Sequence, residues 1–136
     1  MMLFITLMAN SEGSQLAARL GLDPKVFWEI VSVSSGRSWS QQTWYPVPDI
    51  IPTAAANNNF EATFRVDLAA KDVGLALDAG SQTGVRLPAA QLIASQLEEL
   101  IEQGYADRDC SLVALLSTPD GVLDGFTPDA QGAGER

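Results

Sequence analysis

Hydrophobic residues recur along most of this chain at the three- and four-residue spacing of helices, and strand-like alternation is scarce. The first segment, residues 1–20, is apolar on most sides at its start and amphipathic later. Gly21 follows as a left-handed helix stop. A second helix is predicted from Pro24 to about Val33, because Asp23 offers a capping carboxylate and proline fits the first helical position.

The stretch from residue 34 to residue 59 shows no clear period. Connections of this length are usually functional or disordered. Its two tryptophans and one tyrosine argue against simple disorder, because large aromatic side chains tend to be anchored. We predict a short helix near Arg37 to Trp44, followed by extended segments.

Two longer helices are expected next. One fits Phe64 to about Ser81 and is followed by Gly84 and a break at Leu87-Pro88, and the other runs from Pro88 to about Gly104. The expected apolar face of the second comprises Leu92, Ile93, Leu97, Leu100 and Ile101.

The end of the periodic pattern sets the expected domain boundary. Asp107 or Asp109 is expected to cap a last short helix that ends at Leu116. The later residues are rich in Gly, Pro and Asp, which favours mobility. The sequence thus predicts an all-α domain over residues 1–117 and a flexible tail over residues 118–136.

Composition excludes several classes of protein. Hydrophobic residues make up 46% of the 136-residue chain, which rules out wholesale disorder. A net charge of -9 disfavours a nucleic-acid partner. The apolar opening, residues 1–9, is far shorter than the roughly 20 residues of a membrane span, so no membrane partner is expected. Because no targeting signal is visible, we expect a cytoplasmic location in bacteria, with the mitochondrial matrix as an open alternative.

The available chemistry is limited. There is no histidine, which removes imidazole bases and His-ligated metals, and we expect no metal site. Cys110, the only cysteine, is interpreted as a small buried hydrophobic residue. Any chemistry must come from Lys, Arg, Asp, Glu, Ser or Asn side chains.

The third predicted helix carries the most informative residues. Phe64, Lys71 and Asp78 are spaced by seven and share one stripe of a helix, with Gly74 on the same side. A glycine inside a helix lowers helix stability by about 1 kcal/mol relative to alanine, so its presence at position 74 indicates a specific role. Two interpretations fit: a ligand site, or a solvated face on which Asp67 and Lys71 form an i, i+4 pair.

A family resemblance favours the site. Residues 71–78 resemble the K-D-x-G-x-A-x-D signature of the β-hydroxyacid dehydrogenases at every specified position. Residues 21–24, 34–40 and 45–48 resemble corresponding stretches of 3-hydroxyisobutyrate dehydrogenases, in the same order and spacing. The resemblance covers roughly residues 1–116 and is to the C-terminal all-α domain of that family, which follows a Rossmann domain.

The resemblance implies roles for five residues. In that family the signature helix closes over the nicotinamide end of NAD or NADP, so Lys71 is expected to contact the cofactor. Asp72 is expected to help fix the site, and Phe64 to pack near the nicotinamide or the substrate. Trp39 and Ser35 are implied on the substrate side, with a packed loop beneath the helices as the open alternative.

Important parts of the family pattern do not occur in this sequence. The family's catalytic lysine belongs to a K-x-x-x-N motif that aligns just before Met1, and no G-x-G-x-x-G follows a strand. Ala62-Thr63 also replaces the usual Gly-Gly before Phe64. The resemblance implies NAD(P)-dependent oxidation of a β-hydroxy acid to its semialdehyde in a complete parent. We expect the present chain alone to be inert and to bind no cofactor tightly.

A stand-alone helical dimerisation module from a truncated gene is the alternative hypothesis. Under both hypotheses the expected partner is a second copy, in a homodimer or larger homo-oligomer, and the parent also contains the Rossmann domain. Without that domain, residues 1–8 are expected to expose a contiguous apolar patch that favours association.

Overall fold

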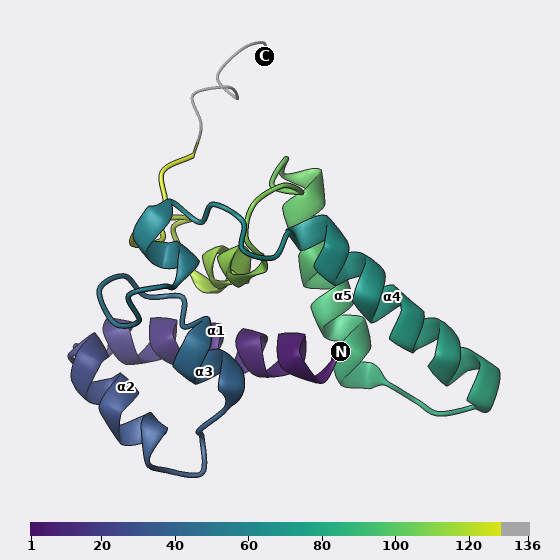
Figure 1. Cartoon of the computed structure of the whole chain (residues 1–136), viewed down its shortest axis with the longest axis horizontal. Coiled ribbons are helices and arrows are strands. Elements are labelled where there is room, and N and C mark those ends of the chain that lie inside the picture. Colours follow the sequence, from purple (N-terminus) through teal and green to yellow (C-terminus); the bar gives the residue numbers. More distant parts are fainter. Residues whose placement is uncertain (129–136) are drawn as a thin grey trace.

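The computed structural model describes residues 1–128, within which every regular element is a helix (Figure 1). The α-helices are α1 (Met2–Arg19), α2 (Pro24–Ser32), α3 (Trp39–Thr43), α4 (Val66–Thr83) and α5 (Pro88–Glu102), and the 3₁₀ helices are η1 (Ala55–Asn58) and η2 (Cys110–Ser117). The all-α prediction is confirmed. No helix in this part of the chain has both the length and the apolar character needed to cross a bilayer.

Local capping explains where the helices begin and end. The Asp23 carboxylate accepts a hydrogen bond from Val26 N at 2.9 Å and starts α2. Ser38 accepts from Gln41 N at 3.2 Å and starts α3. The predicted stops at Gly21 and Gly84 have φ angles of 78° and 74°, the left-handed conformation that glycine adopts without strain.

Helix α4 begins two residues later than the sequence predicts. Val66 N donates to the carbonyl of Arg108, and Asp67 N donates to that of Ala106. These bonds tie the first turn of α4 to the segment before η2. Phe64 therefore lies outside the helix, and its predicted place on one helical stripe with Lys71 is wrong.

The alternative interpretation of this helix included an ion pair between Asp67 and Lys71, which the structure of residues 1–128 does not contain. Arg65, directly before the helix, binds Asp67 with its guanidinium, and the distance from Nε to Oδ1 is 3.0 Å. The Asp67 carboxylate is therefore paired with Arg65, two residues away, and not with Lys71.

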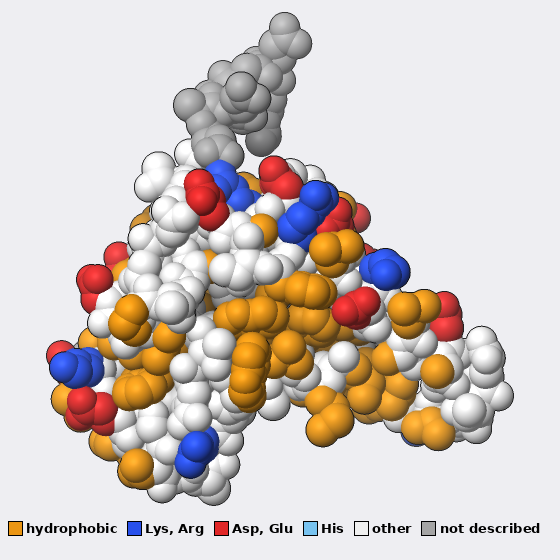
Figure 2. All heavy atoms as spheres, in the orientation of Figure 1, with side chains coloured by type: hydrophobic (Ala, Val, Ile, Leu, Met, Phe, Trp, Pro, Cys, Tyr) orange, Lys and Arg blue, Asp and Glu red, His pale blue; other side chains and the backbone are white. Residues whose placement is uncertain are grey.

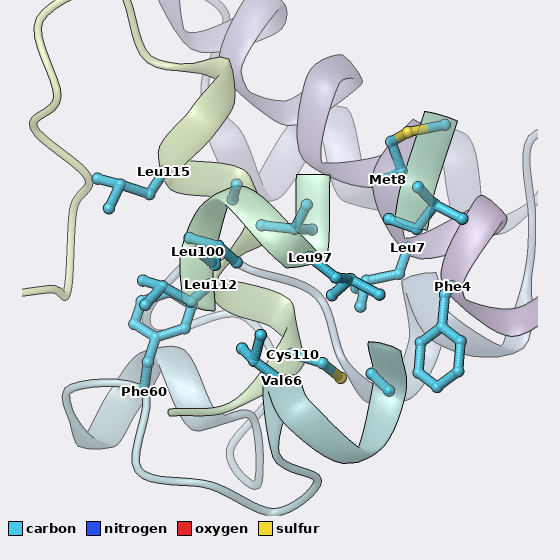
Figure 3. Packing of buried hydrophobic residues seen from close by; sticks show 14 of the residues in the cluster. Phe4, Leu7, Met8, Phe60, Val66, Leu97, Leu100, Cys110, Leu112 and Leu115 are labelled. Atoms are coloured by element: carbon cyan, nitrogen blue, oxygen red, sulfur yellow. The ribbon is translucent and has the colours of Figure 1, made fainter. Parts of the chain in front are cut away.

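The core is built around α1 and η2. Helix α1 packs against η2, α3, α5 and α2, while α4 and α5 form an antiparallel pair (Figure 1). Figure 3 shows side chains from α1, α4, α5 and η2 converging on one cluster. The residues labelled there include Phe4, Leu7, Met8, Val66, Leu97, Leu100, Cys110 and Leu112.

The expected contiguous apolar patch over residues 1–8 is present only in part. Phe4, Leu7 and Met8 are buried, and the partly buried Leu3 and Ile5 pack against the same cluster. Met2 is 76% exposed, so the other helices of this chain cover that end of α1 only in part.

The apolar face of α5 also differs in one position from the prediction. Ile93, Leu97 and Leu100 are buried, and Ile101 packs partly against the core. Leu92 is 51% exposed, because it lies toward the solvent edge of the helix.

The thiol of Cys110 lies within the cluster. Burial raises the pKa of Cys110 far above that of a free thiol, and the neighbouring Asp109 charge raises it further. Such a thiol is unreactive in the folded protein, which agrees with its interpretation as a buried hydrophobic residue.

Packed structure continues past residue 117, where we expected the mobile tail to begin. Leu123 is buried, and the Phe126 ring lies 5.3 Å from that of Tyr105, measured between centroids. Asn59 donates to the carbonyl of Thr127 and accepts from its N–H. These contacts hold residues 118–128 against the body, and the rest of the expected tail, 129–136, lies outside the described residues.

Tyr45 provides a test of this packing by pH. The ring is buried, and within residues 1–128 its hydroxyl has no hydrogen-bond partner. Burial raises the pKa of Tyr45 to about 12. The unfolded chain has a tyrosine pKa of about 10, so the folded state favours the neutral hydroxyl. This preference contributes fully to the free energy of unfolding below pH 10, and the contribution is lost between about pH 10 and pH 12.

We therefore expect the free energy of unfolding to fall by up to about 1.4 kcal/mol per pH unit over that window, measured by urea denaturation. Tyr45→Phe should reduce this slope and preserve stability at pH 7, because it removes an unpaired hydroxyl. Tyr105→Phe serves as the matched control. An unchanged alkaline slope in Y45F would show that other groups cause the loss.

Candidate functional site

Helix α4 presents the predicted cofactor-binding residues on its surface. Lys71 and Asp72 lie on its second turn, both exposed. Within residues 1–128 the Lys71 ammonium has no ion pair and no hydrogen bond, so its three donors are available to a ligand. Asp78 is likewise exposed two turns further along.

Gly74 leaves the surface next to Lys71 open. A Cβ atom placed on Gly74 would meet nothing within 4 Å, so no other part of residues 1–128 occupies this space. Gly80, in the same helix, is different, because a Cβ there would lie 2.9 Å from the carbonyl oxygen of Val85. Glycine is needed at position 80 because the turn after the helix packs closely against it. At position 74 nothing among the described residues requires glycine, and the surface there is open.

Four aromatic side chains form a continuous row beside the start of α4. Ring centroids are 5.3 Å apart between Trp39 and Trp44, 6.1 Å between Trp44 and Phe64, and 5.9 Å between Phe64 and Phe4. We call these four residues the aromatic row. Its outer end, Trp39, is 58% exposed, whereas Phe4 belongs to the core. Figure 2 shows a broad hydrophobic area in the middle of this face.

Hydroxyl and amide groups from α1 fix α3, which carries one end of the aromatic row. Asn10 donates to Ser40 at 2.8 Å and to Ser38 at 3.1 Å, and Thr6 and Ser40 share a hydrogen bond of 2.9 Å. Ser40 is fully buried. Because buried hydroxyls must be paired, this network fixes the position of Trp39 between Ser38 and Ser40.

A second network fixes α3 from the side of α2. Trp28 donates its indole N–H to the carbonyl of Gln41 at 2.9 Å, and the Gln41 amide donates to Ser32 at 2.9 Å. Gln41 is fully buried. Both networks hold the 38–44 segment as ordered structure, in agreement with the argument that its aromatic residues are anchored.

Asp109 positions Phe64. Its carboxylate is fully buried and accepts five hydrogen bonds. Oδ2 accepts from Thr63 N at 2.8 Å, Thr63 Oγ1 at 2.7 Å and Phe64 N at 3.1 Å, while Oδ1 accepts from the N–H and hydroxyl of Ser111. Sequence reasoning identified only its capping role. The bonds to Thr63 and Phe64 cross more than 40 residues and leave no local signal.

The structure unites some of the predicted residues and not others. Phe64 and Trp39 are linked through Trp44, which sequence reasoning did not select. Ser35 lies in the exposed turn after α2, and within residues 1–128 no hydrogen bond connects it to the aromatic row. Lys71 and Gly74 lie further along α4, so the candidate site comprises the open α4 surface and the aromatic row.

Comparison with known proteins shows the family of this chain. The family described as "NAD-binding of NADP-dependent 3-hydroxyisobutyrate dehydrogenase" has a sequence model that matches residues 1–116. The chain belongs to this family. As a member of the 3-hydroxyisobutyrate dehydrogenase NAD-binding family, it carries the K-D-x-G-x-A-x-D residues on an exposed helix beside aromatic side chains.

Relatives in this family include mitochondrial and bacterial enzymes. The chain is 36% identical over 113 residues to human mitochondrial 3-hydroxyisobutyrate dehydrogenase, covering 83% of this chain and 34% of the relative. It is 34% identical over 118 residues to an NAD-dependent L-serine dehydrogenase of Pseudomonas aeruginosa, covering 87% and 40%. The chain thus spans little more than a third of the length of these relatives.

Solved structures of this family agree with the fold. A Mycobacterium tuberculosis 3-hydroxyisobutyrate dehydrogenase, solved with L-serine, superposes with a TM-score of 0.79 at 34% identity, over 83% of this chain and 38% of that one. A Salmonella typhimurium 3-hydroxyisobutyrate dehydrogenase at 22% identity has a TM-score of 0.68 over 85% and 38%, which supports the fold alone.

Proposed function

We propose that this chain is the helical, cofactor-closing domain of an NAD(P)-dependent dehydrogenase that oxidises a β-hydroxy acid to its semialdehyde. The observation that carries the proposal is the Lys71 ammonium, which has no partner within residues 1–128 and lies beside the open surface at Gly74. Family membership and the names of the relatives, which act on 3-hydroxyisobutyrate or L-serine, support the same activity.

These residues suit the nicotinamide end of a dinucleotide. In a complete enzyme, NAD(P) would supply the hydride acceptor for oxidation of the substrate carbon. Lys71 can donate to a carbonyl, hydroxyl or carboxylate oxygen without strict geometric demands. Gly74 permits a flat group or another backbone to approach α4 closely. The exposed end of the aromatic row supplies an apolar wall that excludes water from the reacting atoms.

The 136-residue chain by itself should be inactive. Its sequence has no G-x-G-x-x-G for the pyrophosphate and no K-x-x-x-N before α1, where the family has its general acid or base. Proton transfer of this kind contributes about 10²–10⁴-fold to rate, and a dinucleotide without its cradle binds weakly.

A fusion protein tests the proposal. Met1 of this chain is joined to the N-terminal domain of the Mycobacterium tuberculosis relative, in place of that enzyme's own helical domain. We expect the fusion to reduce NAD with 3-hydroxyisobutyrate or L-serine, and the isolated chain not to do so. Lys71→Ala in the fusion should lower kcat/KM by about tenfold or more.

Arg86→Ala is the matched control, because Arg86 is an exposed cation in the turn that follows α4. It should leave kcat/KM unchanged. A folded fusion without activity, or equal losses in K71A and R86A, would contradict the proposed role. Turnover by the isolated chain would refute its predicted inactivity.

A helical association module is the second candidate function. It is favoured by the large apolar side chains that α2 exposes, which an isolated domain would bury against a partner. DNA sequence upstream of the Met1 codon separates the two candidates. An open frame that encodes G-x-G-x-x-G and ends in K-x-x-x-N supports the dehydrogenase, whereas a nearby stop codon supports the module.

A further inference from the structure

Residues 118–128 are packed against the domain although they lie beyond the match to the family model, which covers residues 1–116. We call residues 118–128 the strap. In Figure 1 the strap runs beside η1, and the contact is close, because a Cβ atom on Gly125 would lie 2.5 Å from the carbonyl oxygen of Ala56. Leu123 of the strap is buried in the core cluster. The strap therefore covers the segment that precedes Phe64 in the chain.

The chain makes an unusual turn directly after η1. Asn59 and Phe60 have φ angles of 48° and 55°, so two successive residues other than glycine adopt the left-handed conformation. Asparagine tolerates this conformation, but a bulky side chain such as phenylalanine rarely adopts it. Such a turn persists only where surrounding contacts hold it. One of these contacts comes from the body of the domain, where Arg108 donates to the carbonyl of Asn59 at 3.3 Å.

The strap contacts both residues of this turn. The Asn59 amide donates to the carbonyl of Thr127 at 3.1 Å, and its oxygen accepts from Thr127 N at 2.7 Å. The Phe126 ring meets the Phe60 ring edge-on, with 6.0 Å between the centroids. Tyr105 holds the Phe126 ring from the body of the domain, with 5.3 Å between these centroids. The strap thus holds the turn by two hydrogen bonds and an aromatic contact.

The turn is connected in its own right to the residues that position Phe64. The carbonyl of Phe60 accepts from Asp109 N at 2.9 Å, and the Asp109 carboxylate accepts from Phe64 N at 3.1 Å. Only three residues separate Phe60 from Phe64 in the chain. A continuous set of contacts therefore runs from the strap through the turn and Asp109 to Phe64.

We propose that Phe126 and Thr127 are positioning residues for Phe64: by holding the turn after η1, the strap fixes the Phe64 ring within the aromatic row. Phe64 lies between Phe4 and Trp44 in that row, with centroids 5.9 Å and 6.1 Å away. Movement of the turn would shift this ring against both neighbours. The structural part of the inference holds under either proposed function, and its effect on substrate binding rests on the proposed dehydrogenase activity.

Hydrogen exchange of the full chain tests the structural part. The N–H groups of Thr63 and Phe64 both donate to Asp109, so their exchange rates report local opening of this segment. Phe126→Ala removes the ring that supports the turn. It should speed exchange at both N–H groups by about tenfold relative to exchange at Leu97, which is buried in α5.

Asp120→Ala is the matched control, because it removes the exposed ion pair between the strap and Arg19 and leaves the contacts to the turn in place. It should leave the ratio of exchange rates unchanged. Asn59→Gly is a second variant, and the fold accommodates it because glycine adopts a left-handed φ without strain. It removes both hydrogen bonds to Thr127, so exchange at residues 63 and 64 should become several-fold faster.

Kinetics of the fusion enzyme test the effect on substrate binding. F126A should raise KM for the hydroxy acid by about three- to tenfold and lower kcat by less, because a displaced Phe64 weakens contacts to the bound substrate. A variant that only reduced the folded fraction would lower kcat and leave KM as it was. D120A should leave both constants unchanged. If the fusion is inactive, the proposed function fails, while hydrogen exchange still decides whether the strap positions Phe64.

Three results would overturn the proposal. The first is equal acceleration of exchange at residues 63, 64 and 97 in F126A, since the strap would then affect only global stability. The second is unchanged exchange at residues 63 and 64 in F126A or in N59G. The third, in an active fusion, is a lower kcat in F126A with an unchanged KM. Should F126A fail to fold, N59G alone decides by the same criteria.

Discussion

Replacing Asp109 with asparagine is expected to lower the free energy of unfolding by about 3–5 kcal/mol. All five hydrogen bonds to this carboxylate come from N–H or O–H donors. An asparagine amide replaces one acceptor oxygen with a donor. In either orientation at least one backbone N–H then faces another donor, because the hydroxyls of Thr63 and Ser111 can turn to accept a hydrogen bond but the N–H groups of Thr63, Phe64 and Ser111 cannot.

Thermal unfolding measures this effect, and we expect Tm to fall by roughly 10 °C or more in D109N. Asp107→Asn is the matched control, because Asp107 is an exposed carboxylate two residues earlier, and it should shift Tm by little. Equal shifts in the two variants would show that the buried bonds contribute no more than surface charge. In the active fusion, D109N should also displace Phe64 and raise KM.

Alanine at Gly80 should destabilise the fold by about 1–3 kcal/mol, whereas alanine at Gly74 should stabilise it by about 0.5–1 kcal/mol. Both positions are interior to α4, so both gain the same helix propensity. At Gly80 the new Cβ would lie 2.7 Å from Leu87 Cδ1 and 2.9 Å from the Val85 carbonyl oxygen, which is backbone and shifts at a cost. At Gly74 the same atom meets open space.

Urea denaturation of the two variants gives the sign of each change directly. At Gly74 the expected effect on activity is opposite in sign to the effect on stability. In the fusion, G74A should reduce kcat/KM while it raises stability, because the methyl group occupies the space that a ligand or the other domain needs. A G74A fusion that is both more stable and fully active would remove Gly74 from the site.

Local signals were enough to predict most helices. Asp23-Pro24 and Pro88 mark helix starts, and Gly21 and Gly84 mark ends, because a cap or a stop depends only on nearby residues. The burial of Ile93, Leu97 and Leu100 follows from helical periodicity in the same way.

Contacts between distant segments could not be predicted. The start of α4 at Val66 depends on bonds to the residues before η2, and the position of Phe64 depends on Asp109. Trp44 lies in a stretch without a period, so nothing local indicated that it joins Trp39 to Phe64. The resemblance predicted a role for Lys71. The structure adds that, among the described residues, its ammonium has no partner and nothing fills the space at Gly74.

The packing of α1 against η2 also determines when this protein can fold. These two elements are separated by about 90 residues of sequence, yet Phe4 and Leu7 share one cluster with Leu112. During synthesis, α1 leaves the ribosome long before the residues that cover it. Its apolar side chains must then remain exposed or be shielded by a chaperone until η2 has been made. Loop closure over this span also predicts slower folding than in helical bundles of similar size whose contacts are local.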